Sequence, residues 1–308
     1  MTIPNWRPGW RFWTLALALT ILAGSLLHPT IPWRSGMHRY LMVLDITQSM
    51  NARDYHQADM PNDRLGFVKE SLRRVLAEMP CGTEIGLGLF TTQHTQILFK
   101  PLELCEHYPV IDAVLAQIDW RMAWAADSHI GHGVFAALRE IGEADPDIRL
   151  VFFSDGQQYP TDAEAAFFHG VPGQIKGLLV GVGGTQPVAI PKLDRENRPQ
   201  GYWDYADLQN YAPSPASPEA RSHDTTLFRS RLDEANLLEL AQRTGLGYHR
   251  LTSPDDLLDA LQAKELAQRR VVPADLRPLA AGLALLALLA TTGLMWRPER
   301  AARSETDA

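Results

Sequence analysis

The sequence has few cysteines and no cluster of basic residues. Only two of the 308 residues are cysteine, and Asp and Glu outnumber Lys and Arg by 36 to 29, which gives a formal net charge of −7. Nucleic-acid-binding domains carry a basic patch or stripe, so binding to nucleic acid is not expected. The chain also has neither a Gly-x-Ser-x-Gly nucleophile elbow nor a phosphate-cradling glycine loop, which argues against two common kinds of hydrolase.

Charged residues are missing from two long stretches near the ends of the chain. Residues Phe12–Trp33 and Pro278–Trp296 contain no Asp, Glu, Lys or Arg. A helix needs roughly 20 apolar residues to cross a bilayer, so both stretches predict membrane helices. The first stretch follows Arg7 and Arg11 and can also be a cleaved signal peptide, but no small-x-small cleavage site lies near Leu27. An uncleaved anchor is therefore the favoured prediction.

These stretches divide the chain into a membrane anchor (1–34), a soluble domain (35–276), a second transmembrane helix (277–297) and a polar tail (298–308). The overall composition, 45% hydrophobic and 21% charged, is that of an ordinary globular protein. Basic residues flank both stretches on both sides, so the positive-inside rule does not fix the orientation of the domain.

The two cysteines bracket a predicted β-hairpin. Residues 83–92 and 95–102 are expected to form strands around a turn near Gln93, and Cys81 and Cys105 would then lie opposite each other at its open end. A disulfide there would indicate an oxidising compartment. Two unrelated buried thiols remain the alternative. The disulfide favours a domain on the periplasmic side of a bacterial inner membrane.

Strand and helix patterns alternate along the domain. Strands are predicted at 40–44, 83–92, 95–102, 149–154, 175–182 and 248–251, and helices at 63–79, 109–119, 130–142, 233–245 and 254–268. Such alternation predicts a doubly wound, mostly parallel sheet of the Rossmann-like kind, with the hairpin adding one antiparallel edge strand. The pattern breaks over residues 185–230, an irregular insertion within which 211–223 is expected to be a flexible loop.

Oxygen-bearing side chains follow the two most apolar strands. Asp45, Thr47 and Ser49 come directly after the first strand, and Asp155 follows the strand at 149–154. Open α/β sheets bind ligands at the carboxyl ends of their strands. Hard oxygen ligands suit Mg²⁺, Mn²⁺ or Ca²⁺. The alternative is a set of turns in which Thr47, Ser49 and Ser128 only cap helices.

The run Asp45-Ile46-Thr47-Gln48-Ser49 resembles the metal-ion-dependent adhesion site of von Willebrand factor A (VWA) domains, whose first motif is Asp-x-Ser-x-Ser. The resemblance implies that Ser128 replaces a second-loop Thr and that Asp155 is the third-loop Asp. It further implies one divalent cation, Mg²⁺ by preference and Mn²⁺ or Ca²⁺ otherwise. An open coordination position would then take an acidic side chain of a protein partner.

Several other polar residues lie near these motifs. Asp127 directly precedes Ser128, where the VWA pattern does not usually place an acid, and it would add negative charge near the ion. Asp54 and Asp59 follow the first motif, and His129 and His132 follow the second. These four are expected to be solvated loop residues, with an auxiliary metal contact as the alternative.

The segments 190–203 and 230–248 resemble the membrane-anchored bacterial VWA proteins of the aerotolerance (Bat) type, which are encoded with MoxR-type AAA+ ATPases. Residues 44–51 and Asp119–Trp124 are similar to the MxaL-type proteins, which are implicated in assembling, and placing calcium in, periplasmic methanol dehydrogenase. The resemblance implies a membrane-tethered, non-enzymatic assembly or maturation factor. A metal-dependent phosphoester hydrolase and a structural membrane scaffold with a vestigial site are the alternatives.

Overall fold

The computed structural model describes residues 9–123, 127–159, 166–204, 207 and 228–293. The chain divides into two compact units. One comprises Gly36–Gln268, and the other joins Met1–Ser35 to Arg269–Ala308. The predicted flexible loop at 211–223, the polar tail at 298–308, Arg7 and Trp124 all lie outside the described residues.

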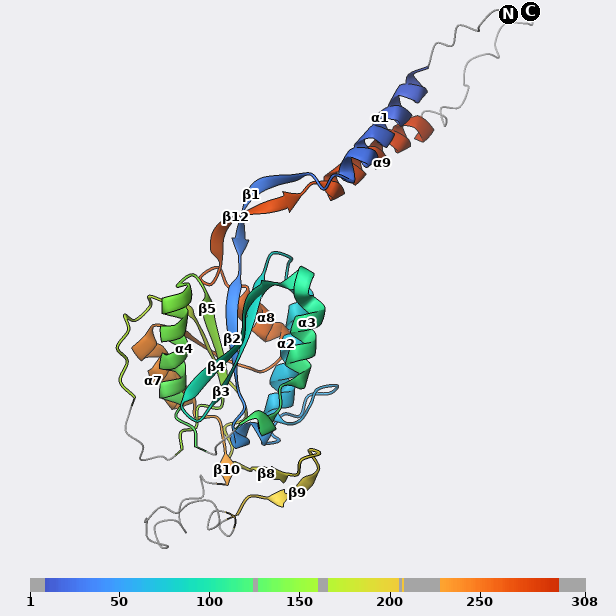
Figure 1. The fold of residues 1–308 in the computed structure, drawn as a ribbon. Helices are drawn as coiled ribbons and strands as arrows, with labels where there is room; N and C mark the ends of the chain where they lie inside the picture. The colour runs from blue at the N-terminus through green and yellow to red at the C-terminus, as the bar shows by residue number, and fades with distance from the viewer. Residues whose placement is uncertain (1–8, 124–126, 160–165, 205–206, 208–227, 294–308) are drawn as a thin grey trace, which may run out of the picture. The chain divides into compact units, whose positions relative to one another are not determined.

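The larger unit is built on a six-stranded sheet with the order β11-β6-β5-β2-β3-β4 (Figure 1). The strands are β2 (Arg39–Asp45), β3 (Glu84–Thr91), β4 (His94–Glu103), β5 (Arg149–Ser154), β6 (Gly177–Gly181) and β11 (Gly247–Arg250). Neighbouring strands are parallel except β4, which pairs antiparallel with β3 at one edge. The predicted mostly parallel sheet with one antiparallel edge strand is confirmed.

Helices cover both faces of this sheet (Figure 1). One face packs against α2 (Arg64–Glu78), α3 (Leu104–Gln117) and α8 (Pro254–Leu261), and the other against α4 (Ile130–Ala144) and α7 (Glu234–Thr244). Along β2, Met42 and Leu44 join the first core while Leu41 and Val43 join the second. Burial on both faces explains why β2 is a continuous apolar run.

Two predicted helices have different bounds in the structure. Helix α3 begins at Leu104 rather than at Pro109, because the side chain of Glu103 caps it by accepting a hydrogen bond from the Glu106 amide (2.6 Å). Helix α8 ends at Leu261 rather than near 268. Helix α2, in contrast, begins as predicted, with the Asp63 carboxylate accepting from the Gly66 amide (2.7 Å).

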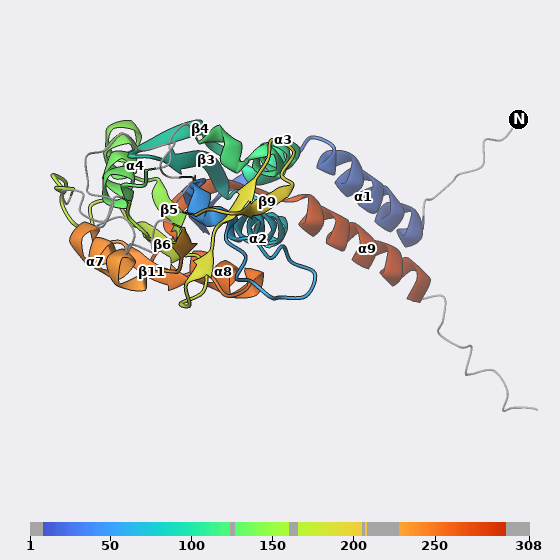
Figure 2. The same ribbon diagram turned by 90° about the horizontal axis from the view of Figure 1, so that it is seen from below.

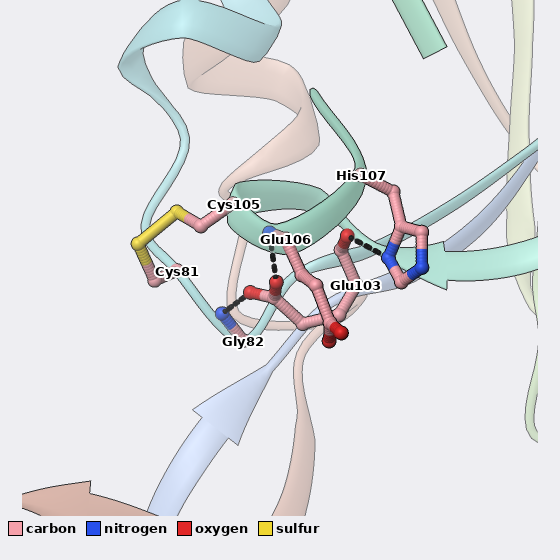
Figure 3. The surroundings of a disulfide bond; sticks show 6 residues. All are labelled: Cys81, Gly82, Glu103, Cys105, Glu106 and His107. Atoms are coloured by element: carbon pink, nitrogen blue, oxygen red, sulfur yellow. Dashed lines mark hydrogen bonds between the residues drawn. A yellow bond between two sulfur atoms is a disulfide. The ribbon is translucent and has the colours of Figure 1, made fainter. Parts of the chain in front are cut away.

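The predicted disulfide closes the open end of the β3–β4 hairpin (Figure 3). The Cα atoms of Cys81 and Cys105 are 5.3 Å apart, and the hairpin register pairs Glu84 with Glu103. Glu103 lies beside the disulfide, but its two carboxylate oxygens accept hydrogen bonds from the amides of Gly82 and Glu106, each at 2.6 Å. The cluster of Cys81, Glu103 and Cys105 is therefore a structural junction and not a metal site.

Two small sheets lie beyond the carboxyl ends of the parallel strands. β7 (Val188–Ala189) pairs with β10 (Arg229–Ser230), and β8 (Pro191–Leu193) pairs with β9 (Pro199–Tyr202), both antiparallel. In Figure 1 they lie below the sheet, at the end where β2 leads into the 3₁₀ helix η1 (Gln48–Asn51), and Figure 2 views the unit from that end. They form the described part of the predicted irregular insertion.

The smaller unit contains α1 (Trp10–Ser25) and α9 (Arg277–Gly293), which lie side by side. Strand β1 (Thr30–Met37) pairs with β12 (Gln268–Asp275), a pairing that the sequence did not predict. Within the described ranges, no helix combines the length and the apolar character that crossing a membrane requires.

Candidate metal centre

The loop after β2 gathers three side-chain oxygens. The Oδ1 atom of Asp45 accepts hydrogen bonds from the amide (2.9 Å) and the hydroxyl (2.7 Å) of Thr47, and the Thr47 hydroxyl lies 3.1 Å from that of Ser49. Thr47 occupies the N-cap position of η1, yet its side chain makes no capping hydrogen bond. The helix-cap alternative therefore does not account for the Thr47 hydroxyl, which turns towards Asp45 instead.

Ser128 is held at the same edge of the sheet by backbone pairing. Its amide and carbonyl pair with Tyr159 (2.9 and 2.8 Å), and it bridges to Thr92, two residues beyond the Phe90 that lies in register with Asp45. The Ser128 hydroxyl is buried and has no hydrogen-bond partner in the described structure. It does not cap α4 either, whose N-cap residue is His129. An unsatisfied buried hydroxyl costs about 1–3 kcal/mol, which a bound ligand would recover.

Asp155 follows β5 and is fully buried. Its Oδ2 atom accepts hydrogen bonds from the Ser230 hydroxyl (2.7 Å) and from Nη1 of Arg64 (2.8 Å), and its Oδ1 atom accepts from the Gln157 amide (3.1 Å). The turn needs a glycine at 156, where φ is +74° and a Cβ atom would lie 2.7 Å from the Asp233 carbonyl oxygen. Asp155 is thus held in a fixed orientation.

Ser154 links the first and third loops. Because β5 is the neighbour of β2, the Ser154 hydroxyl can donate to Oδ2 of Asp45 (2.7 Å), and it accepts from the Gly156 amide (3.0 Å). Burial, and after it the charge of Asp155, together raise the pKa of Asp45 to about 7, against the lowering effect of the hydrogen bonds from Thr47 and Ser154. The hydrogen bonds to Asp45 come from the neutral groups of Thr47 and Ser154, so among the described residues no positive charge contacts its carboxylate.

Arg64, like Ser154, is not among the residues that the sequence predicts for the site. It is fully buried at the start of α2, where its Nε and Nη2 atoms donate to the carboxylate of Asp54 (2.6–3.1 Å) and its Nη1 atom donates to Asp155. Arg64 lies four residues before Val68 and eight before Leu72, on the buried face of the helix. That spacing was the available signal that its charge is internal.

The prediction that Asp54 is a solvated loop residue is wrong. Its side chain is only 6% exposed, because it pairs with Arg64 and accepts a hydrogen bond from the Gly184 amide (2.7 Å). Asp59 and His132 are exposed, as predicted. His129 is partly buried, and its Nε2 atom lies 3.5 Å from a carboxylate oxygen of Asp127. Asp127 therefore contacts a neighbouring loop residue.

The arrangement suits a hard divalent cation. The predicted ligands Asp45, Thr47 and Ser49 lie together by direct contact, Ser154 joins Asp45 to the loop of Asp155, and backbone pairing holds Ser128 at the same edge. All five offer oxygen, the donor type that Mg²⁺, Mn²⁺ and Ca²⁺ prefer. The orphan hydroxyl of Ser128 and the uncompensated charge of Asp45 are the two features that a cation would satisfy.

No protein-family model matches the sequence, and no curated protein matches it either. Solved structures with a similar fold include an aerotolerance-related membrane protein from Bacteroides fragilis, carrying multiple mutations to serine, at 16% identity and a TM-score of 0.48 over 74% of this chain and 96% of that one. BatB from Bacteroides thetaiotaomicron gives 17% identity and a TM-score of 0.48 over 75% and 97% of the two chains. A von Willebrand factor type A protein from Catenulispora acidiphila gives 9% identity and a TM-score of 0.39 over 83% and 44%. At identities and TM-scores this low, the likeness speaks at most to the fold.

Proposed function

We propose that this protein binds one divalent cation at the carboxyl ends of β2 and β5 and uses it to capture an acidic side chain of a protein partner. Asp45, Thr47, Ser49, Ser128 and Asp155 would hold the cation, the hydroxyls directly and the two carboxylates either directly or through a water molecule. The observation that carries the proposal is the buried, unpartnered hydroxyl of Ser128 at the sheet edge where Asp45 and its two hydroxyl neighbours meet. The role is one of binding, without catalysis.

Each proposed ligand has a distinct part. Asp45 supplies full negative charge, while Thr47, Ser49 and Ser128 supply neutral hydroxyl oxygens that leave most of the cation's charge unneutralised. When bound, the cation would act as a Lewis acid that attracts an outside carboxylate. Mg²⁺ is the preferred ion because it keeps several waters and tolerates incomplete protein ligation, and Mn²⁺ or Ca²⁺ are the alternatives.

We further propose that the protein is tethered to the bacterial inner membrane with its larger unit in the periplasm. Large apolar side chains are exposed along α1 and α9, among them Trp13, Leu19, Leu279 and Leu286. Large exposed apolar side chains of this kind suit contact with lipid. The Cys81–Cys105 disulfide suits an oxidising compartment.

The partner class follows from the proposed site and from the sequence resemblance. A cation with an open position selects a protein that presents Asp or Glu, which suits an assembly or maturation factor. A MoxR-type ATPase system and the assembly components of methanol dehydrogenase are the candidate systems, and the latter is the narrower proposal. A phosphoester hydrolase would need a second carboxylate at position 47, where a threonine is hydrogen-bonded to Asp45.

Thermal unfolding with added cation tests the proposed site. Mg²⁺ at a hundredfold excess over its dissociation constant should stabilise the wild type by about 2.7 kcal/mol. Asp45→Ala should abolish the response, whereas Asp59→Ala, which removes an exposed acid of the following loop, should keep it. Capture of an acidic partner should likewise fail in chelator and in Asp45→Ala. A wild type whose melting temperature ignores Mg²⁺, Mn²⁺ and Ca²⁺ would instead identify a scaffold with a vestigial site.

A further inference from the structure

The Arg64 guanidinium is a resident positive charge inside the proposed cation site. It is fully buried and lies between two buried carboxylates, with Nη2 2.6 Å from Asp54 and Nη1 2.8 Å from Asp155. Nη1 also contacts the hydroxyl of Ser230. Arginine suits such a position because its planar fork can serve two carboxylates at once.

Arg64 makes the two acids of the site unequal. Asp155 receives one charged donor, Arg64, and two neutral donors, Ser230 and the Gln157 amide. Among the described residues, Asp45 receives hydrogen bonds only from neutral donors, Thr47 and Ser154. Hydrogen bonds from a charged donor are roughly twice as strong as neutral ones, so Asp155 is the acid less free to give its charge to a cation.

The surrounding backbone is shaped around this ion pair. Gly183, after β6, has φ of +107°, and a Cβ atom there would lie 2.7 Å from Cζ of Arg64. The next amide, of Gly184, donates to Asp54. The segment Leu232–Asp233 is hydrogen-bonded to the loops that follow β6 and β5. The Leu232 amide donates to the Gly184 carbonyl and the Asp233 amide donates to the Asp155 carbonyl, each at 2.7 Å. Gly183 therefore approaches the guanidinium closely, and the Gly184 amide holds the Asp54 carboxylate that pairs with it.

We infer that Arg64 is a built-in counter-cation that keeps Asp155 from binding the divalent cation directly, so that the cation stays under-neutralised and depends on the partner's carboxylate. This inference rests on the proposed function and concerns how that site is tuned. Arg64 is a positioning residue in this scheme. Its effect has a distinctive sign: it weakens the binding of the cation alone and strengthens the capture of an outside carboxylate.

The test uses the full chain with Asp54 and Arg64 replaced together, as Asp54→Asn with Arg64→Met. Removing Arg64 alone would leave uncompensated buried charge. The double substitution removes one negative and one positive charge, so the net charge of the site is unchanged. Mn²⁺ binding is followed by electron paramagnetic resonance, exchangeable waters on Mn²⁺ by proton relaxation, and carboxylate capture by titrating acetate onto the Mn²⁺-loaded protein.

The double variant should bind Mn²⁺ about tenfold more tightly, with about one exchangeable water fewer, and should bind acetate about tenfold more weakly. A residue that only supports the site would have the opposite effect, since losing an outer-shell partner typically costs 10–100-fold in metal affinity. Unchanged or weaker Mn²⁺ binding in the double variant would therefore overturn the inference.

Two further variants keep the test decisive. Ser230→Ala keeps the ion pair but removes one donor to Asp155, and it should tighten Mn²⁺ binding by a smaller factor. If the double variant does not fold, Ser230→Ala decides the test: Mn²⁺ binding that is not tighter than in the wild type would overturn the inference. Arg39 also bridges two acids, Glu84 and Asp145, but at the opposite end of β2. Arg39→Met with Glu84→Gln is thus the matched control and should leave Mn²⁺ binding unchanged.

Failure of the proposed function would look different. In that case Mn²⁺ binding would be absent from the wild type or insensitive to Asp45→Ala. Mn²⁺ binding that is lost in Asp45→Ala but not tightened in the Asp54→Asn, Arg64→Met variant refutes only the role of Arg64.

Discussion

The affinity of the site for a divalent cation should depend steeply on pH between 5 and 7. The perturbation is protonation of Asp45, whose pKa is raised from 3.8 to about 7 by burial and by the charge of Asp155. A cation must displace that proton, so below pH 7 each decrease of one pH unit should weaken cation binding about tenfold. From pH 8 to pH 5 the loss is about 100-fold, or roughly 2.7 kcal/mol.

Titration calorimetry with Mn²⁺ at pH 5, 6, 7 and 8 and constant ionic strength measures this slope. An Asp45 with its ordinary pKa would leave the affinity nearly flat over the whole range. A flat profile in a wild type that binds Mn²⁺ would therefore refute the assignment of Asp45 as the buried, uncompensated ligand.

The stability of the cation-free protein should change with pH in the opposite direction, falling as pH rises. The raised pKa means that the folded state keeps a proton on Asp45 that the unfolded state has lost. The contribution of Asp45 to the free energy of unfolding is therefore complete below about pH 4. It falls by about 4 kcal/mol in total as pH rises to about 7, and it stays constant above that pH. Asp45→Asn should remove this slope, which urea unfolding at several pH values would reveal.

Two further predictions concern the scaffold. Reducing the Cys81–Cys105 disulfide, or replacing both residues with serine, should lower the free energy of unfolding by about 3 kcal/mol through the larger entropy of the unfolded chain; urea unfolding that is insensitive to reductant would contradict this. Gly183→Ala should cost about 2–3 kcal/mol, because it combines a positive φ with a collision against Arg64, whereas Gly173→Ala has a positive φ in open space and should cost about 1 kcal/mol. Equal melting temperatures for the two glycine variants would refute the close approach at Arg64.

The sequence predicted the features that depend on local pattern. Strand β2 was recognisable because burial on both faces demands an unbroken apolar run, and α2 because Asp63 caps it and its apolar residues recur at helical spacing. The disulfide followed from hairpin register, which pairs residues equidistant from the turn. Helix α3 begins before its predicted start at Pro109, because the side chain of Glu103 caps it at Leu104.

The sequence could not predict the features that depend on distant partners. Asp54 and Arg64 lie in or next to a polar loop, and a charged residue in such a loop is usually exposed. Their burial follows from Asp155 and Ser230, which arrive 91 and 166 residues after Arg64. The pairing of β1 with β12 likewise joins segments from opposite ends of the chain.

Anomalous diffraction from crystals grown with Mn²⁺ tests the central proposal most directly. The proposed function predicts one strong peak at the carboxyl ends of β2 and β5, among the side-chain oxygens of Asp45, Thr47, Ser49, Ser128 and Asp155. A peak at another place in the chain, or none at these oxygens at saturating Mn²⁺, would contradict it.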